Sequence, residues 1–299
     1  HKKIAQVRHS ARKGEDMVEK TNQTYALVIH RFEDIFHSFY ACEVIRGVSI
    51  AASRIKTDVL IHIFEKLSLD LWLNSLLYRQ GYLDGIIFAD VNGESQILNK
   101  FIAKEIPFLV MNNYLAGPIN CISIDNKSGA IASINHLIEL GHTKIATITG
   151  NMNTEAAKKR LEGYKFALEK HKIKLKEEYI KNGDFLRTPA RAAAGELLKL
   201  KNPPTAIFAA SDVMALEVID VALSLGIKVP SQLSVIGFDD NPLGVYSPVP
   251  LTTVGQPIME MGRLALETLN QIILKKQKTP VKIIMPSKLI KRDSCGKIS

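Results

Sequence analysis

The sequence predicts an α/β fold made of two similar doubly wound parallel-sheet subdomains with a ligand cleft between them. Short runs rich in Val, Ile and Phe alternate with amphipathic helical patterns from Thr24 onward, and this alternation is typical of parallel βαβ units. The number of such units over 299 residues exceeds one comfortable sheet, so two domains of similar size fit better. No apolar run approaches the ~18 residues that a membrane helix needs, and we therefore expect no membrane partner.

The first half of the chain supplies half of these elements. Its expected strands occupy 25–29, 58–63, 85–88, 108–111 and 121–124. Its expected helices occupy 39–54, 69–80, 94–104 and 127–140. The last of these helices closes at Gly141, because glycine readily adopts the left-handed conformation that ends a helix.

The second half repeats the same alternation. Its expected strands are 144–149, 179–184, 205–209, 233–237 and 281–285. Its expected helices are 154–171, 188–200, 212–225 and 256–275. The helix near 259–273 is apolar on more than one side. A second surface is needed to cover such a helix. We therefore expect the helices near 39–54 and 259–273 to form a homodimer contact.

Composition and charge narrow the function classes. The chain is 46% hydrophobic, which excludes disorder. The net charge is +9, and residues 1–20 hold six basic against three acidic side chains. The lysines of 169–181 and 275–297 alternate with Glu or apolar residues, as expected for solvated helix and loop faces. The three cysteines are widely scattered, which favours a reducing cytoplasm over a disulfide framework.

Motifs of catalysis are missing from the sequence. It contains no G-x-G-x-x-G after the first strand, no phosphate-binding P-loop, no G-x-S-x-G nucleophile elbow and no H-E-x-x-H pair. The neighbouring carboxylates Asp239 and Asp240 end a strand. They therefore point to opposite sides and cannot act together as general acid and base. We expect no enzyme activity, no cofactor and no metal.

Polar residues gather just after the expected strands. In doubly wound sheets, ligands bind outside the carboxyl ends of the strands. The polar segments at these positions are His30–Asp34, Ala89–Val91, Asn112-Asn113, Asp125, Ser211-Asp212 and Asp239-Asp240. This set predicts a binding site for a small polar molecule.

A series of short motifs then follows in a recognisable order and spacing. They are Leu83–Ile87, Ile106–Val110, Ile124–Asn126, His136-Leu137, Leu140–His142, Arg160–Tyr164, Pro204–Ala209, Ser211-Asp212, Val235–Asp240, Pro250–Val254, Met261-Gly262 and Arg292–Gly296. Over residues 24 to 296 the chain resembles the effector-binding core of LacI/GalR-family bacterial transcription regulators. That core has a periplasmic-binding-protein-like fold of type I.

The resemblance implies a ligand-binding role for several residues. Arg160 matches the arginine that hydrogen-bonds the effector, and its rigid fork of donors suits vicinal hydroxyls or a carboxylate. Asp239 matches the acidic residue that accepts from effector hydroxyls or ring nitrogens, while Asp240 supports the loop. Phe185 matches the aromatic residue that stacks on the effector. The remaining implied positions are Asn112, Asp125, Ser211, Asp90 and Tyr40.

The resemblance also implies operator DNA as a partner, but we do not expect this chain alone to bind it specifically. The family carries an N-terminal helix-turn-helix of about sixty residues, and a recognition helix needs such a folded unit. Residues 1–23 are too few to build it and are expected to be a basic leader or a hinge remnant. Ser10–Lys13 is similar to the end of the family's hinge helix, which makes Arg12 a DNA-contacting candidate, although Gly14 replaces the usual leucine.

The sequence thus predicts a cytoplasmic regulator core that binds a small effector, forms a homodimer and binds operator DNA in the full-length protein only. We expect an N-terminal subdomain of residues 24–123 with 253–282 and a C-terminal subdomain of 124–252 with 283–299, joined by three crossings. Closure on a sugar or sugar derivative would change operator affinity. The alternative is a periplasmic sugar-binding protein of a transport system, which shares the fold and the cleft.

Overall fold

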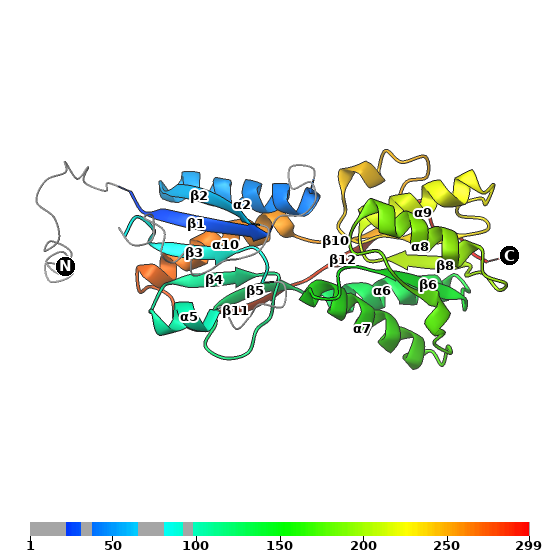
Figure 1. Cartoon of the computed structure of the whole chain (residues 1–299), viewed down its shortest axis with the longest axis horizontal. Helices are drawn as coiled ribbons and strands as arrows, with labels where there is room; N and C mark the ends of the chain where they lie inside the picture. Colours follow the sequence, from blue (N-terminus) through cyan, green and yellow to red (C-terminus); the bar gives the residue numbers. More distant parts are fainter. Residues whose placement is uncertain (1–21, 31–37, 65–80, 92–97, 299) are drawn as a thin grey trace, which may run out of the picture.

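The computed structural model describes residues 22–30, 38–64, 81–91 and 98–298. They form two α/β lobes that lie end to end, with the C-terminus at the far end of the second lobe (Figure 1). Arg12, the expected helix at 69–80 and most of the His30–Asp34 segment lie outside the described residues.

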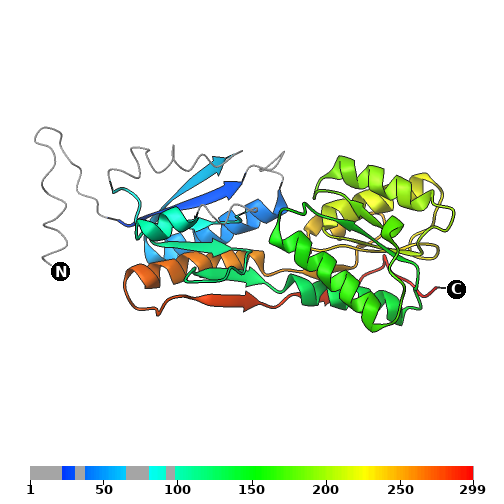
Figure 2. The ribbon, with the colours of Figure 1, turned by 60° about the horizontal axis from the view of Figure 1, so that its bottom comes forward.

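A six-stranded parallel sheet forms the N-terminal lobe, with the strand order β11-β5-β4-β3-β1-β2. Its strands are β1 (Thr24–His30), β2 (Asp58–Phe64), β3 (Gly85–Phe88), β4 (Phe108–Met111), β5 (Cys121–Ile124) and β11 (Lys282–Met285). Its helices are α2 (Phe39–Ile55), α5 (Leu98–Ala103) and α10 (Ile258–Ile273). Helices α2 and α10 cover one face of the sheet and α5 lies on the other (Figure 2).

Strand β1 shows how the sequence builds this lobe. Tyr25, Leu27 and Ile29 pack into the core under α2 and α10, whereas Ala26 and Val28 pack into the core of the opposite face. Because successive side chains of a strand point to opposite faces, a strand covered on both faces must be continuously apolar. The short apolar runs of the sequence follow from this double coverage.

The C-terminal lobe repeats the plan with a four-stranded parallel sheet in the order β7-β6-β8-β9. The strands are β6 (Ile145–Thr149), β7 (Ile180–Asn182), β8 (Ala206–Ala209) and β9 (Ser234–Ile236). The helices are α6 (Asn126–Glu139), α7 (Glu155–Lys170), α8 (Arg187–Leu198) and α9 (Asp212–Ser224), with 3-10 turns η3 (Glu177–Tyr179) and η4 (Pro242–Gly244). Helices α8 and α9 cover one face of this sheet, and α6 and α7 cover the other.

Three crossings join the lobes. The first runs from β5 into α6 at Asp125. A two-stranded antiparallel ribbon of β10 (Thr253–Gly255) and β12 (Lys288–Ile290) then fixes the other two. Bridges from Ile236 to Thr252 and from Asp239 to Gly255 attach β10 to the C-terminal lobe. The second crossing therefore follows β10, and the third lies between β11 and β12.

These positions differ by three residues from the expected boundaries at 252/253 and 282/283. Strand β10 belongs to the C-terminal lobe, and all of β11 belongs to the sheet of the N-terminal lobe. The ribbon strands have three residues each, which is too short to show a periodic pattern, and the sequence therefore gives no sign of where each lobe ends.

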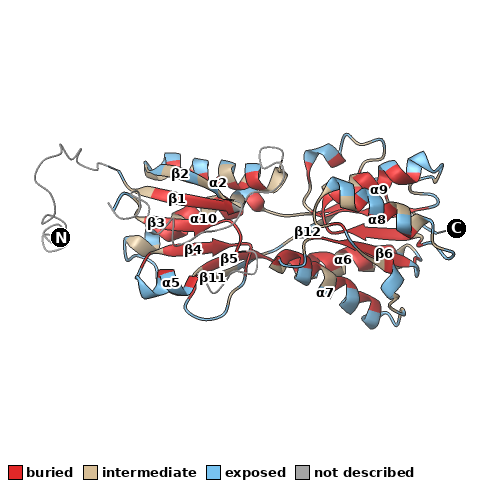
Figure 3. Cartoon of the chain, viewed as in Figure 1, coloured by how far each residue is buried: buried red, intermediate tan, exposed pale blue. Residues whose placement is uncertain are grey.

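The buried residues fill the sheets and the inner faces of the helices in both lobes (Figure 3). Helix α6 is followed by Gly141 at φ 94°, as the sequence predicts. Within the described ranges, no helix has the length and apolarity needed to cross a membrane. The same ranges hold no group of three or more His, Cys, Asp or Glu side chains that could bind a metal ion.

Candidate effector-binding site

Arg160 occupies the centre of the C-terminal half of the site. It lies on α7 and is only 4% exposed. Its Nε donates to Asn126 Oδ1 at 2.8 Å and its Nη1 donates to the Ala210 carbonyl at 2.5 Å. The guanidinium also lies 3.8 Å from the centre of the Phe238 ring, a cation–π contact. These contacts fix the guanidinium beside the start of α6 and the carboxyl ends of β8 and β9.

Asp239 follows β9 and faces this arginine. Its Oδ1 lies 3.7 Å from Arg160 Nη1 and accepts a hydrogen bond from Gln256 Nε2 at 2.5 Å. Burial raises the pKa of the Asp239 carboxyl, and the Arg160 charge opposes that rise. Burial likewise lowers the pKa of Arg160 to about 10, against the opposing effect of Asp239. The guanidinium thus remains charged at neutral pH.

Phe185 is a second aromatic residue near the guanidinium. Its ring centre is 5.7 Å from the Arg160 guanidinium carbon, and its backbone has a φ of 61°. A Cβ on Gly150 would lie 2.0 Å from this ring. The glycine after β6 therefore makes the space in which the aromatic ring lies.

The N-terminal lobe contributes Tyr40, Asp90 and Asn112. The Tyr40 hydroxyl donates to the Ala89 carbonyl at 2.5 Å. Asp90 Oδ1 accepts from Asn113 Nδ2 at 2.7 Å, and Asp90 Oδ2 lies 3.5 Å from Asn112 Nδ2. Since a carboxylate only accepts, this contact orients the Asn112 amide. It leaves Asn112 Oδ1 buried without a hydrogen-bond partner among the described residues.

The two halves lie within electrostatic reach of each other. Burial raises the pKa of the Tyr40 hydroxyl, the Asp90 charge raises it further, and the Arg160 charge lowers it. Tyr40 belongs to α2 of one lobe and Arg160 to α7 of the other. Tyr40 of one lobe therefore lies within range of the charge of Arg160 in the other.

Two of the expected ligand residues also cap helices. Asp125 Oδ1 accepts from the Ser128 amide at 3.0 Å and caps α6. Ser211 Oγ accepts from the Met214 amide at 3.4 Å and caps α9. Asp and Ser are favoured at this position because they satisfy free amides of the first helical turn. Neither side chain is among the contacts of Arg160 and Asp239.

Comparisons with known proteins identify the family of the chain. The periplasmic binding protein-like domain family matches residues 134–295, more than half of the chain. The transcriptional repressor CytR of Escherichia coli is 33% identical over 261 residues, which cover 85% of this chain and 73% of CytR. A solved LacI transcriptional regulator of Bacillus cereus subsp. cytotoxis has a TM-score of 0.86 at 29% identity, covering 93% of this chain and 100% of that one. The chain belongs to the LacI family of transcriptional regulators.

Two further proteins similar to this LacI-family chain are also transcriptional regulators. The transcriptional regulator DegA of Bacillus subtilis is 36% identical over 225 residues, or 74% of this chain and 66% of DegA. The solved complex of the transcriptional regulator CelR with cellobiose has a TM-score of 0.82 at 28% identity, covering 91% of this chain and 85% of CelR. The chain thus spans about two thirds to three quarters of the curated relatives. These relatives are regulators, which favours the regulator over the transport alternative and confirms the predicted fold class.

Sequence analysis of this LacI-family chain missed several residues of the site. Asn126 and Phe238 contact Arg160, and Gln256 contacts Asp239. The first two stand beside predicted residues at strand ends, a signal that could have included them. Gln256 had no such signal, because it lies between a three-residue strand and α10. Asp240 does support its loop: its Oδ1 accepts from Arg292 Nη2 at 2.6 Å.

Proposed function

We propose that this chain is the effector-sensing core of a repressor-type regulator that binds a small polar molecule, a sugar or sugar derivative, between its two lobes. The observation that carries the proposal is that Tyr40 interacts electrostatically with Asp90 of its own lobe and with Arg160 of the other lobe, which itself pairs with Asp239. A ligand held by both lobes binds the closed arrangement better than an open one. It therefore shifts the balance between them by that difference in affinity.

Hydrogen-bond chemistry supports a hydroxyl-bearing ligand. The buried acceptor Asn112 Oδ1 has no donor in the part of the chain that the structure describes, and an unsatisfied buried acceptor costs about 1–3 kcal/mol. A ligand hydroxyl can donate to it and also accept from Arg160. The aromatic ring of Phe185 beside the guanidinium suits the apolar face of a sugar. The cellobiose complex of CelR, 28% identical to this chain, points to the same ligand class.

The proposed partners are a second copy of the chain and operator DNA, as in the family. In the proposed mechanism, closure reorients the N-terminal segments of a homodimer and changes the affinity of the full-length regulator for operator DNA. The protein acts in the cytoplasm, where the operator is found, and has no enzymatic role. The names of DegA and CytR, an HTH-type regulator and an HTH-type repressor, support this assignment.

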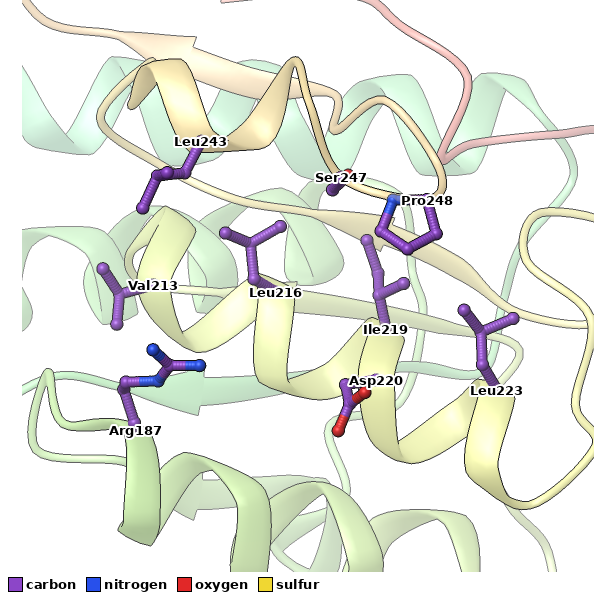
Figure 4. A pocket seen from close by; sticks show the side chains of 9 residues that line it. All are labelled: Arg187, Val213, Leu216, Ile219, Asp220, Leu223, Leu243, Ser247 and Pro248. Atoms are coloured by element: carbon purple, nitrogen blue, oxygen red, sulfur yellow. The ribbon is translucent and has the colours of Figure 1, made fainter.

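The dimer contact of this proposal lies on the C-terminal lobe. The apolar side chains of α10 pack largely against α2 and the sheet, so its apolar pattern does not require a partner. A groove lies between α9 and the 243–248 loop. Its apolar lining is Val213, Leu216, Ile219, Leu223, Leu243 and Pro248, and Arg187, Asp220 and Ser247 complete it (Figure 4). Beside it Tyr246 is 85% exposed, and solvent-exposed apolar patches of this kind mark interaction surfaces.

A thermal-shift screen tests the effector proposal. Probes are monosaccharides, cellobiose, sugar phosphates, nucleobases and nucleosides. Bound ligand stabilises by about 2.7 kcal/mol at a hundredfold excess over Kd, which raises Tm by several degrees in a protein of this size. A neutral sugar should raise the Tm of the wild type but not of Asp239→Asn. A response to nucleobases alone, or an equal response of both proteins, would contradict the proposal.

A further inference from the structure

The turn after β9 holds its backbone in an unfavourable conformation. Asp239 has φ 136° and Asp240 has φ 59°, and positive values are uncommon for residues other than glycine. Two such residues in succession persist only where the surroundings fix them firmly. The turn also carries Asp239, the carboxylate of the proposed effector site.

Asp212 makes several of the hydrogen bonds that hold this turn in place. It is the first residue of α9 and is fully buried. Its Oδ2 accepts from the Asn241 amide at 2.7 Å, its Oδ1 accepts from Thr253 Oγ1 at 2.5 Å, and its own amide donates to the Phe238 carbonyl at 2.8 Å. The carboxylate thus binds the turn on one side and β10 on the other.

Gly237 makes this placement possible. A Cβ at Gly237 would lie 2.1 Å from Asp212 Oδ1, well inside van der Waals contact, so only glycine lets the carboxylate approach the end of β9. The position is electrostatically costly as well, since burial and the neighbouring Asp239 both raise the pKa of Asp212. A buried carboxylate beside a second carboxylate needs its hydrogen bonds to remain in place.

The same contacts reach the second crossing. Thr253 begins β10, and the Asp239 amide donates to the Val254 carbonyl at 2.8 Å. Gln256, just after β10, donates to Asp239 Oδ1. The turn, the ribbon strand and the start of the crossing are thereby held as one unit, with Asp212 beneath it.

We propose that Asp212 is a positioning residue of the effector site: it holds the strained turn and β10 in the arrangement in which Asp239 faces Arg160, and it thereby links the site to the second crossing. Asp212 itself does not touch the effector. The proposal rests on the proposed function only in assigning effector binding to Asp239. The placement of the turn by Asp212 can be tested without any ligand.

Amide hydrogen exchange is the ligand-free test. Asp212→Ala removes both acceptors. Thr253→Val leaves Asp212 unchanged but removes the Thr253 hydroxyl, which donates to Asp212 Oδ1 and accepts from the Asp240 amide at 3.4 Å. Exchange at the Asp239 and Asn241 amides should become about ten- to hundredfold faster in both variants, with Asp212→Asn intermediate and Thr253→Ser close to wild type. Amides of the central strand β8 should keep their protection.

Asp220→Asn is the matched control, because Asp220 lies on the same helix with an exposed side chain that pairs with Arg191. It should leave all these rates unchanged. Unchanged exchange at the turn, or an equal loss of protection across the whole lobe, would overturn the proposal. If Asp212→Ala does not fold, Thr253→Val and Asp212→Asn decide the outcome.

Calorimetry with cellobiose and D-glucose as probes tests whether Asp212 also affects binding at the effector site. Asp212→Asn and Thr253→Val should weaken binding of whichever probe the wild type binds by about five- to fiftyfold, whereas Asp220→Asn should not. Unchanged affinity would overturn the role of Asp212 at the site. If the wild type binds neither sugar, the sugar assignment loses support, while the exchange rates still decide whether Asp212 positions the turn.

Discussion

Arg160 is more deeply embedded than a ligand-contacting residue at the mouth of a cleft would be. From the sequence, we expect removal of Arg160 to leave folding intact, because a cleft residue leaves no large cavity. The structure instead gives its guanidinium two buried acceptors, Asn126 Oδ1 and the Ala210 carbonyl. At this site, effector binding and folding stability therefore depend on the same side chain.

Arg160→Ala should consequently impair both properties. It should lower the free energy of unfolding by about 1–3 kcal/mol, because two buried acceptors lose their donor. Asp239→Ala removes a group that faces the site, and each substitution should weaken effector binding by about 1.5–3 kcal/mol. Urea unfolding and calorimetry on the two variants measure the two effects separately. Unchanged effector affinity in either variant would remove that residue from the site.

The two buried carboxylates predict an unusual dependence of stability on pH. Burial raises the pKa of both Asp212 and Asp239 above the ordinary aspartate value. The folded state therefore binds their protons more tightly than the unfolded state. Their stabilising contribution is fully present below about pH 4 and is lost as pH rises through the folded pKa values toward neutrality.

Asp212→Asn tests this dependence, because an amide does not titrate. The stability of the variant minus that of wild type should rise between pH 5 and pH 8, by on the order of 1 kcal/mol or more, whatever the difference at pH 5. Urea unfolding at several pH values measures the difference, with Asp220→Asn as an exposed control. A difference that stays constant over this pH range would contradict the raised pKa of Asp212.

At the scale of elements, the close crossing of α2 and α10 organises the N-terminal lobe. A Cβ on Gly47 of α2 would lie 1.9 Å from the Met259 carbonyl oxygen, and one on Gly262 of α10 would lie 2.7 Å from the Val44 carbonyl oxygen. The two backbones touch at these glycines. Their approach is what lets α10 bury Met261, Ala265 and Leu269 in the core.

Gly47→Ala should therefore destabilise the protein by about 1–3 kcal/mol, the range for overpacking a core, because a backbone carbonyl cannot move aside as a side chain can. Gly195→Ala is the matched control: this glycine lies within α8 with nothing within 4 Å of the added carbon. Alanine there should stabilise by about 0.5–1 kcal/mol. Urea unfolding of both variants gives the comparison, and two effects of the same sign would contradict it.

The sequence predicted the long elements well for a physical reason. Strands covered on both faces must be apolar throughout, and amphipathic helices must be apolar on one face, so both leave a pattern that can be read locally. The ribbon of β10 and β12 has no such pattern, and Asp212, Asn126 and Gln256 join the site through partners far along the chain. Asp212, for example, meets Thr253 only because β10 follows β9 back into the same lobe.

At the scale of the molecule, the positive charge is spread rather than concentrated. Exposed lysines follow the C-terminal ends of helices in both lobes, such as Lys172 after α7 and Lys275 after α10. At this position they complement the helix dipole. The net charge of +9 therefore does not by itself indicate a DNA-binding face.

The 299-residue chain should consequently bind DNA weakly and without sequence preference. Any binding should come from the basic residues 1–20 and fall steeply with salt, because it depends on counterion release. Titration of operator-like and scrambled duplexes at two salt concentrations measures both properties. Sequence-dependent nanomolar binding at physiological salt would contradict the prediction.

The groove of α9 and the 243–248 loop predicts how two copies assemble. Leu243 and Tyr246 are 61% and 85% exposed beside this groove, and their burial against a second copy would contribute about 25 cal/mol per Å² of apolar area. The substitutions Leu243→Glu and Tyr246→Glu would place charges in that contact. They should convert the dimer into a monomer of 33.2 kDa without lowering Tm at the monomer level, because neither side chain belongs to the core. Light scattering at tens of micromolar measures the mass.

Phe166→Glu is the control. Phe166 is an exposed aromatic residue on α7 of the same lobe, and its substitution should leave the dimer intact. A wild-type monomer would refute the dimer itself, and a dimer that persists in both groove variants would move the contact to another face.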